Sequence, residues 1–250
     1  MDTGRAARTT TVVVTGANKG IGYETAAALG RLGARVFVGS RDARRGDDAA
    51  ARLRAEGLDA HALLLDVDDD ESVVAAAGKI AAVTGELDAL VNNAAIKLES
   101  SPSPPSACPI AEVRATFETN VFGTIRVIQA MLPLLLRAPE PRIVNVSSGL
   151  GSSTLATTPG SRYMEVPLLS YNASKAALNS VTVQFANELR STHCKVNAAD
   201  PGYASTDMTA TSRPTDRSAA EAAGVVVRLA TLPPDGPTGA FYDEHGEVPW

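Results

Sequence analysis

Residues that would stabilise a small secreted, metal-bound or membrane-spanning protein are scarce in this sequence. Only two cysteines and three histidines occur among the 250 residues, and none of them shows the spacing of zinc ligands. No apolar run approaches the ~20 residues that a membrane-spanning helix needs. A disulfide framework is therefore excluded, and we expect neither a bound metal nor a membrane partner.

Positive charge is also in short supply. The formal net charge is −5, which does not indicate a nucleic-acid partner. The basic residues Arg41, Arg44 and Arg45 form the one exception, a local cluster. The segment Met1–Thr10 is polar and lacks the apolar stretch of a secretory signal. We therefore expect a cytoplasmic protein with no nucleic-acid partner.

The composition does allow a large buried core. Hydrophobic residues make up 44% of the chain, and its length suits one domain spanning 1–250. No internal repeat or linker divides the sequence. The Pro/Ser stretch at 100–109 is too short to separate domains, so we expect a surface loop there.

Short apolar runs alternate with alanine-rich helical segments along the chain. The run Thr11–Val14 predicts a buried strand, and the apolar stripe of 21–32 predicts a helix that ends at Gly33. Further strands are predicted at 35–38, 60–65, 87–91, 142–146, 194–199 and 240–242. Further helices are predicted at 43–56, 70–83, 110–137 (kinked near Pro133), 170–190 and 219–231. This alternation predicts the α/β class, as a Rossmann-type doubly wound parallel sheet of about seven strands with helices on both faces.

Glycines follow the first predicted strand and open the first predicted helix. They allow a tight turn and a close approach of a pyrophosphate to backbone N–H groups at a helix N-terminus. The pattern lacks the Gly-Lys-Ser/Thr of a nucleoside triphosphatase loop. We therefore predict a dinucleotide site in the half of the chain at about 10–147. The loop residues expected to bind it are Gly16, Asn18, Lys19, Gly20, Ile21 and Gly22.

The residues after the second predicted strand indicate which dinucleotide binds. NAD is commonly recognised here by a carboxylate that bonds the ribose 2′-hydroxyl. This chain instead has Ser40 and Arg41, and Lys19 can approach from the glycine loop. Two cations and a hydroxyl suit a 2′-phosphate, so we predict NADPH/NADP+ as the cofactor.

Tyr171 and Lys175 lie four residues apart at the start of a predicted helix. Residues at this spacing share one helix face. An ammonium beside a phenol favours the phenolate and lowers the tyrosine pKa from its usual value of about 10. The pair therefore predicts a general acid or base.

The glycine loop and the Tyr-x-x-x-Lys pair, in this order and at this separation, resemble the short-chain dehydrogenase/reductase family. Within that family the likeness is greatest to NADPH-dependent carbonyl reductases, in the segment Phe117–Thr124 and in the tail that ends at Trp250. The resemblance implies reduction of a ketone or aldehyde carbonyl by hydride transfer. It implies the catalytic residues Asn120, Ser148, Tyr171 and Lys175.

The resemblance implies further cofactor contacts. Asp66 and Val67 match the pair at the adenine ring, and Asn93 and Ala94 belong to a motif that supports the sheet and the adenine ribose. The segment after the sixth predicted strand would hold the nicotinamide carboxamide. The residues implied in this segment are Pro201, Gly202 and Thr206, while Tyr171 and Lys175 also touch the cofactor.

Two departures from the family pattern affect these expectations. Ala95 stands where glycine is usual, which adds only a methyl group. Ser148 and Tyr171 are 23 residues apart, more than is usual, so 149–170 contains an insertion. The family forms tetramers or dimers, whereas the insertion and the carbonyl-reductase likeness favour a monomer. The sequence leaves monomer or homo-oligomer open.

In the implied mechanism, Ser148 orients the carbonyl oxygen, Lys175 lowers the pKa of Tyr171, and Asn120 holds a water that resupplies protons. Two alternatives remain: a pathway-specific ketoreductase or alcohol dehydrogenase for one bulky metabolite, and a non-enzymatic NADP(H)-binding sensor. The segments expected to face substrate are 149–170 and 203–217, with Tyr163, Met164 and Tyr203 as candidate walls.

Overall fold

A seven-stranded parallel sheet forms the centre of the computed structural model, which describes residues 9–209 and 215–250. The strand order is β3-β2-β1-β4-β5-β6-β7, and each neighbouring pair is parallel. The strands are β1 Thr11–Val14, β2 Arg35–Ser40, β3 Ala60–Leu64, β4 Ala89–Asn92, β5 Arg142–Val146, β6 Lys195–Ala199 and β7 Phe241–Tyr242. The order reverses between β1 and β4, where a doubly wound sheet opens a ligand crevice. The predicted fold class is thereby confirmed.

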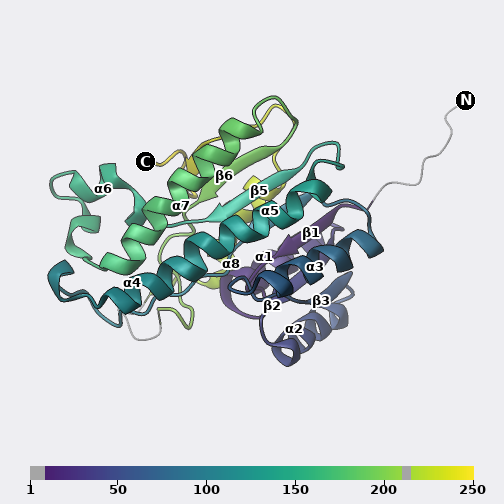
Figure 1. The fold of residues 1–250 in the computed structure, drawn as a ribbon, viewed down its shortest axis with the longest axis horizontal. Helices are drawn as coiled ribbons and strands as arrows, with labels where there is room; N and C mark the ends of the chain where they lie inside the picture. The colour runs from purple at the N-terminus through teal and green to yellow at the C-terminus, as the bar shows by residue number, and fades with distance from the viewer. Residues whose placement is uncertain (1–8, 210–214) are drawn as a thin grey trace, which may run out of the picture.

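Helices cover both faces of this sheet (Figure 1). They are α1 Gly20–Arg31, α2 Ala43–Ala55, α3 Asp70–Val83, α4 Ile110–Phe117, α5 Thr124–Leu135, α6 Ser153–Thr157, α7 Leu169–Glu188 and α8 Ala219–Ala230. One apolar core joins the sheet to α1, α2 and α8, and a second joins it to α3, α5 and α7.

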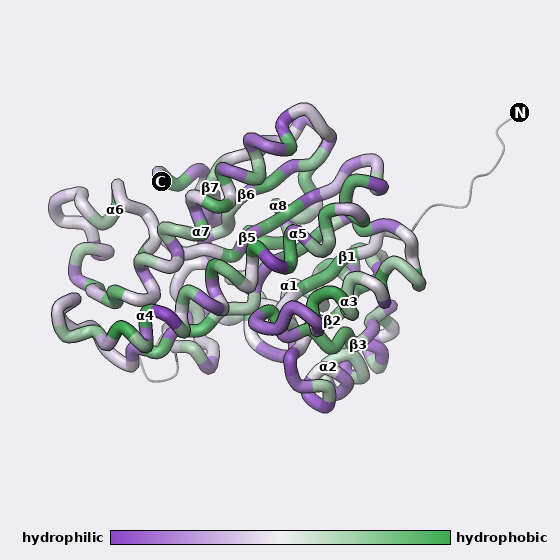
Figure 2. Tube along the Cα trace, viewed as in Figure 1, coloured by the Kyte–Doolittle hydropathy of each residue, from purple (hydrophilic) through white to green (hydrophobic). Residues whose placement is uncertain are grey.

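The β1 valines show why the sheet is covered twice. Val12 and Val14 belong to the first core and Val13 to the second, and all three are fully buried. Successive side chains of a strand point to opposite faces, so a continuous apolar run needs helices on both sides. The strands accordingly appear hydrophobic in Figure 2, whereas the outer parts of α2 are hydrophilic.

The helix predicted at 110–137 departs from α geometry where the sequence did not indicate it. A six-residue π-helix, Glu118–Gly123, separates α4 from α5, while Pro133 lies inside α5 near its C-terminal end. Asn120 lies in this π-helix and its amide bonds the backbone of Ile96, a contact 24 residues away along the chain. The sequence predicts an irregularity near Pro133, whereas the structure has it at Glu118–Gly123, where the Asn120 amide bonds Ile96.

The insertion at 149–170 folds into short helical turns rather than an open loop. Two 3-10 turns, Gly149–Gly151 and Arg162–Glu165, flank the short helix α6. The Ser152 side chain caps α6, and the Ser161 side chain caps the turn Arg162–Glu165. Among residues 9–209 and 215–250, no helix is both long and apolar enough to cross a membrane.

Candidate active site

The carboxyl ends of the central strands open onto one cavity of about 600 Å³. Such a position is expected for a ligand site in a doubly wound sheet. Eight of the predicted site residues line it: Ile21, Asn93, Ser148, Tyr171, Lys175, Pro201, Gly202 and Thr206. The structure therefore brings together three of the four residues implied as catalytic with the residues implied at the nicotinamide.

The glycine loop forms a cradle that only glycine permits. Gly16 and Gly20 have φ values of +62° and +59°, in the left-handed region. A Cβ at Gly22 would lie 2.4 Å from the Asn93 amide nitrogen and 2.7 Å from the Gly16 carbonyl oxygen. Helix α1 begins here without a side-chain cap, so its first N–H groups are open to an anion. These features fit the pyrophosphate of a dinucleotide.

The motif after β4 holds this loop in shape. The Thr15 hydroxyl accepts hydrogen bonds from the backbone N–H groups of Asn93 and Ala94, both at 2.9 Å. The Asn93 side chain donates to the carbonyl oxygens of Thr15 and Gly16 at 2.9 and 3.2 Å. Asn93 and Ala94 therefore fasten the glycine loop to the centre of the sheet.

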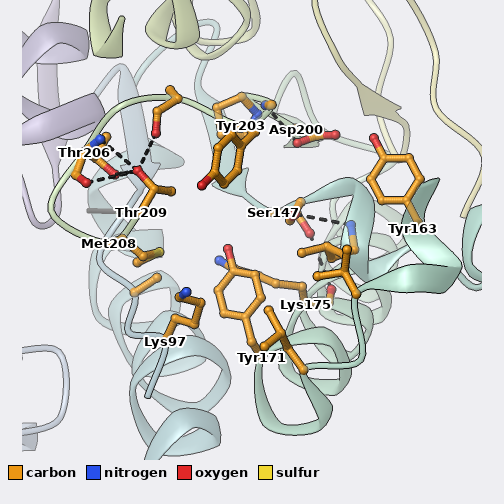
Figure 3. A pocket seen from close by; sticks show the side chains of 18 of the residues that line it. Lys97, Ser147, Tyr163, Tyr171, Lys175, Asp200, Tyr203, Thr206, Met208 and Thr209 are labelled. Atoms are coloured by element: carbon orange, nitrogen blue, oxygen red, sulfur yellow. Dashed lines mark hydrogen bonds between the residues drawn. The ribbon is translucent and has the colours of Figure 1, made fainter. Parts of the chain in front are cut away.

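Tyr171 and Lys175 lie together on α7 and face the cavity (Figure 3). The Lys175 Nζ is 5.6 Å from the centroid of the Tyr171 ring and donates to the Val146 carbonyl oxygen at 2.7 Å. Ser148, at the end of β5, hydrogen-bonds Tyr171 and accepts from the backbone N–H of Leu150 at 3.2 Å. A phenol, a hydroxyl and an ammonium thus converge at one end of the cavity.

The balance of charges around Tyr171 differs from the one we expected. Burial, and then the negative charge of Asp200, raises the pKa of Tyr171 far above its ordinary value, and the hydrogen bond with Ser148 opposes this only in part. Spacing alone suggested that Lys175 lowers this pKa, so that expectation is wrong for the protein described here. The reason is desolvation, which penalises the charged phenolate of a buried ring.

Lys175 shows the same effect with the opposite sign. Burial lowers the pKa of Lys175 to about 8, and the carboxylate of Asp200 offsets part of the fall. The side chain is 2% exposed, so the protonated amine is costly to bury. The site therefore keeps this lysine at the expense of stability.

We expect Lys175→Met to reveal this cost as a pH dependence. Between the folded pKa of about 8 and the unfolded value of 10.5, the unfolded chain binds more protons, so wild-type stability rises with pH across this window. The free energy of unfolding of the wild type minus that of the variant should rise by about 3 kcal/mol from pH 7 to 10.5.

Urea titrations at several pH values and fixed ionic strength measure this difference. Burial raises the pKa of the Cys194 thiol to about 12, which makes stability fall above its unfolded pKa. Cys194 is present in both proteins, so its contribution cancels. A difference that does not change with pH would mean that Lys175 titrates as an exposed lysine.

Asn120, the fourth residue implied as catalytic, does not line the cavity. Its Oδ1 accepts from the Ile96 N–H at 2.8 Å, and its Nδ2 donates to the Ile96 carbonyl and the Ser174 hydroxyl, both at 3.0 Å. The amide thus joins the segment after β4 to helix α7. Its expected part in holding a water stays a prediction.

The residues predicted for the adenosine half lie outside the cavity, around the ends of β2 and β3. Ala17 N–H donates to the Gly39 carbonyl at 2.9 Å, which brings the glycine loop beside Ser40 and Arg41. Asp66 and Val67 follow β3, and Val67 is buried. These residues therefore lie at the same sheet edge as the glycine loop.

Lys19 has a partner that the sequence did not indicate. Its Nζ lies 2.5 Å from an Asp207 carboxylate oxygen, in an ion pair exposed to solvent. The pair lowers the pKa of Asp207 and links the glycine loop to the segment of Thr206. Lys19 thus contacts Asp207 rather than turning toward Arg41.

Two of the three candidate walls are confirmed as cavity residues. Tyr163 and Tyr203 line the cavity, and in Figure 3 the hydroxyls of Tyr203 and Tyr171 face each other across it. The prediction that Met164 forms a cavity wall is wrong, because this residue is 52% exposed and does not line the cavity. Of the segment predicted at 203–217, residues 210–214 lie outside the described residues.

Asp200 is a cavity residue that sequence reasoning missed. It is 5% exposed, accepts from the Gly202 N–H at 2.9 Å, and has its pKa raised by burial. Its position directly after β6 and before Pro201-Gly202 was the available signal, since acidic groups at strand ends often face ligands. In the described part of the chain, no group of three or more His, Cys, Asp or Glu side chains could hold a metal ion.

Comparisons with known proteins agree with this geometry. The short chain dehydrogenase family matches residues 10–217. The (−)-isopiperitenone reductase of Mentha piperita is 34% identical, with 92% of this chain and 95% of that protein covered. Carbonyl reductase (NADPH) 1 of Mus musculus is 32% identical, with 95% of this chain and 97% of that protein covered.

A solved structure extends the likeness to three dimensions. The NADPH-bound carbonyl reductase from chicken fatty liver has a TM-score of 0.83 and 27% identity, covering 97% of this chain and 100% of that chain. The resemblance expected from the glycine loop and the Tyr-x-x-x-Lys pair is confirmed. The chain belongs to the short-chain dehydrogenase/reductase family, whose members bind a nicotinamide cofactor and act on alcohol and ketone groups.

Proposed function

We propose that this chain is an NADPH-dependent carbonyl reductase with Tyr171 as its general acid. The observation that carries the proposal is the convergence of Tyr171, Ser148 and Lys175 on one cavity beside the glycine loop. The relatives named carbonyl reductase and isopiperitenone reductase support a carbonyl as the reacting group.

In the proposed reduction, Tyr171, Ser148 and Lys175 each have a distinct part. The Tyr171 phenol would donate its proton to the carbonyl oxygen as negative charge develops there. Ser148 would hydrogen-bond the same oxygen and orient it. The cofactor, when bound, supplies the hydride that reduces the carbonyl carbon. Lys175 would bind the hydroxyls of the nicotinamide ribose. Its ammonium would place a positive charge beside Tyr171.

The end of β2 supports NADPH over NADH. Arg41, Arg44 and Arg45 are exposed there, next to the glycine loop. The carboxylate of Asp42, which follows Arg41, caps α2 by accepting from the Arg45 N–H at 3.0 Å. An edge with exposed arginines, and with Ser40 and Arg41 in place of a carboxylate at the end of β2, suits a 2′-phosphate rather than a 2′-hydroxyl.

Arg41→Ala should raise the KM for NADPH by about tenfold or more and leave the KM for NADH within about twofold, because only the phosphate pairs with the guanidinium. Arg54→Ala, on the far end of α2, is the matched control, and its NADPH kinetics should stay at wild-type values. Equal changes for both cofactors on Arg41→Ala would remove the basis for NADPH preference.

A substrate panel tests the proposed activity directly. NADPH oxidation should be followed with aldehydes, small ketones and bulky cyclic ketones. The cavity of about 600 Å³ and its lining by Tyr163, Tyr203, Leu150 and Val166 favour a bulky apolar ketone. A protein that binds NADPH tightly and turns over none of these compounds would be the NADP(H) sensor instead.

A further inference from the structure

Helix α7, which carries Tyr171 and Lys175, begins without a cap of its own. Its N-cap residue is Leu168, which has no side-chain oxygen and makes no capping hydrogen bond. Tyr171 is the third residue of the helix, inside the first turn. The first N–H groups of a helix have no partner within it, and helix ends open first. The position of the Tyr171 ring therefore depends on whatever holds this turn.

Glu99 supplies the missing acceptor from a distant segment. Its Oε1 accepts from the backbone N–H of Ser170 at 2.7 Å and from that of Tyr171 at 3.4 Å. These are the second and third N–H groups of α7, the ones that an N-cap side chain ordinarily bonds. A carboxylate at this end also interacts favourably with the helix dipole.

The Glu99 carboxyl is buried and bonds only the first turn of α7 among the described residues. Glu99 is 7% exposed, and its Oε2 has no hydrogen-bond partner among the described residues. Its neighbours Ser100, Ser101 and Pro102 line the cavity, but Glu99 does not, so it does not face substrate. Burying a carboxyl is costly, so its only hydrogen bonds, to these two N–H groups, indicate that it serves as their acceptor.

The segment that carries Glu99 is itself held on both sides. The Asn120 amide bonds the N–H and the carbonyl of Ile96, three residues before Glu99. On the other side, the Ser103 N–H donates to the Pro167 carbonyl at 3.1 Å, just before α7 begins. The Thr116 hydroxyl also donates to the Ser170 hydroxyl at 3.3 Å. Glu99 is therefore presented to α7 from a fixed position.

We propose that Glu99 is a positioning residue for Tyr171: its carboxylate caps α7 from outside the helix and sets where the phenol stands in the cavity. The kinetic consequence rests on the proposed function, because it requires Tyr171 to be the general acid. The structural consequence, protection of the Tyr171 N–H, does not require it.

Glu99→Ala should lower kcat by about 10- to 100-fold and leave the Kd for NADPH within about twofold, because the cavity loses alignment while the glycine loop is untouched. Glu99→Gln should restore kcat to within about threefold, since the amide oxygen can accept the same two hydrogen bonds. Amide hydrogen exchange at Tyr171 should be at least about tenfold faster in E99A than in the wild type.

Asp69→Ala is the matched control. Asp69 caps α3 by accepting from the N–H groups of Glu71 and Ser72, at 2.9 and 3.4 Å, away from the cavity. This variant should lose thermal stability but keep wild-type kcat and wild-type exchange at Tyr171. Glu99→Asp, whose shorter side chain cannot reach Ser170, gives the same test if E99A does not fold.

Wild-type kcat and exchange in E99A would overturn the proposal, as would E99Q being as impaired as E99A. An equal fall of kcat in D69A and E99A would also overturn it, because both would then act through stability alone. If the wild type reduces no carbonyl, the proposed function fails, while the exchange rate at Tyr171 still decides whether Glu99 caps α7.

Discussion

Tyr171→Phe should lower kcat by about 10²- to 10⁴-fold, the range that a positioned general acid contributes, while the Kd for NADPH changes by less than about threefold. The variant keeps the ring and removes only the hydroxyl that hydrogen-bonds Ser148. The Tyr203 hydroxyl faces that of Tyr171 across the cavity and is the alternative donor to be tested (Figure 3). Stopped-flow and steady-state NADPH oxidation measure the effect.

Tyr203→Phe is the control that decides between the two hydroxyls. It removes one hydroxyl from the same cavity and should leave kcat within about fivefold, since Tyr203 lies on the segment after β6 and not beside Lys175. If Tyr203→Phe abolishes turnover and Tyr171→Phe does not, the general acid is Tyr203 and the proposed mechanism is wrong.

Gly22→Ala should both destabilise the fold and close the dinucleotide cradle. The new methyl would lie 2.4 Å from the Asn93 amide nitrogen and 2.7 Å from the Gly16 carbonyl oxygen. Asn93 would be forced off its bonds to Thr15 and Gly16, which are partly buried. Overpacking together with lost hydrogen bonds should cost about 2–4 kcal/mol of unfolding free energy.

The same change should weaken NADPH binding by about 10²-fold, because the loop can no longer approach a pyrophosphate closely. Fluorescence titration and thermal denaturation measure the two effects. Gly224→Ala, inside α8 with no atom within 4 Å of the added Cβ, is the control. It should raise stability by about 0.5–1 kcal/mol and leave NADPH binding unchanged. Similar effects of the two substitutions would mean that Gly22 is an ordinary helical glycine.

Local patterns were sufficient to predict most of the fold. The valines of β1 form an uninterrupted apolar run, and the structure buries them in two cores on opposite faces of the sheet. The glycine loop was equally readable, because positive φ values and close packing each require the absence of a Cβ. The predicted bounds of α3, 70–83, match the structure, because Asp69 and the acidic residues of the first turn mark the start of the helix.

Long-range contacts explain where the predictions failed. The π-helix at Glu118–Gly123 contains Asn120, whose amide bonds Ile96, and no pattern near Pro133 reports that pairing. The pKa of Tyr171 is raised by burial and by Asp200, although the spacing to Lys175 suggested the reverse. Met164 lies in the predicted segment but is 52% exposed, because the order of side chains in a short helical turn depends on its packing.

The sequence by itself determined the parallel sheet, the glycine loop after β1, and the pairing of Tyr171 with Lys175 on α7, since each follows from periodicity or from spacing within one element. The tertiary structure alone decided that Lys19 pairs with Asp207, that Glu99 accepts from the first turn of α7, and that burial raises the pKa of Tyr171. These features depend on desolvation and on contacts between distant segments, and both are set only when the chain is packed.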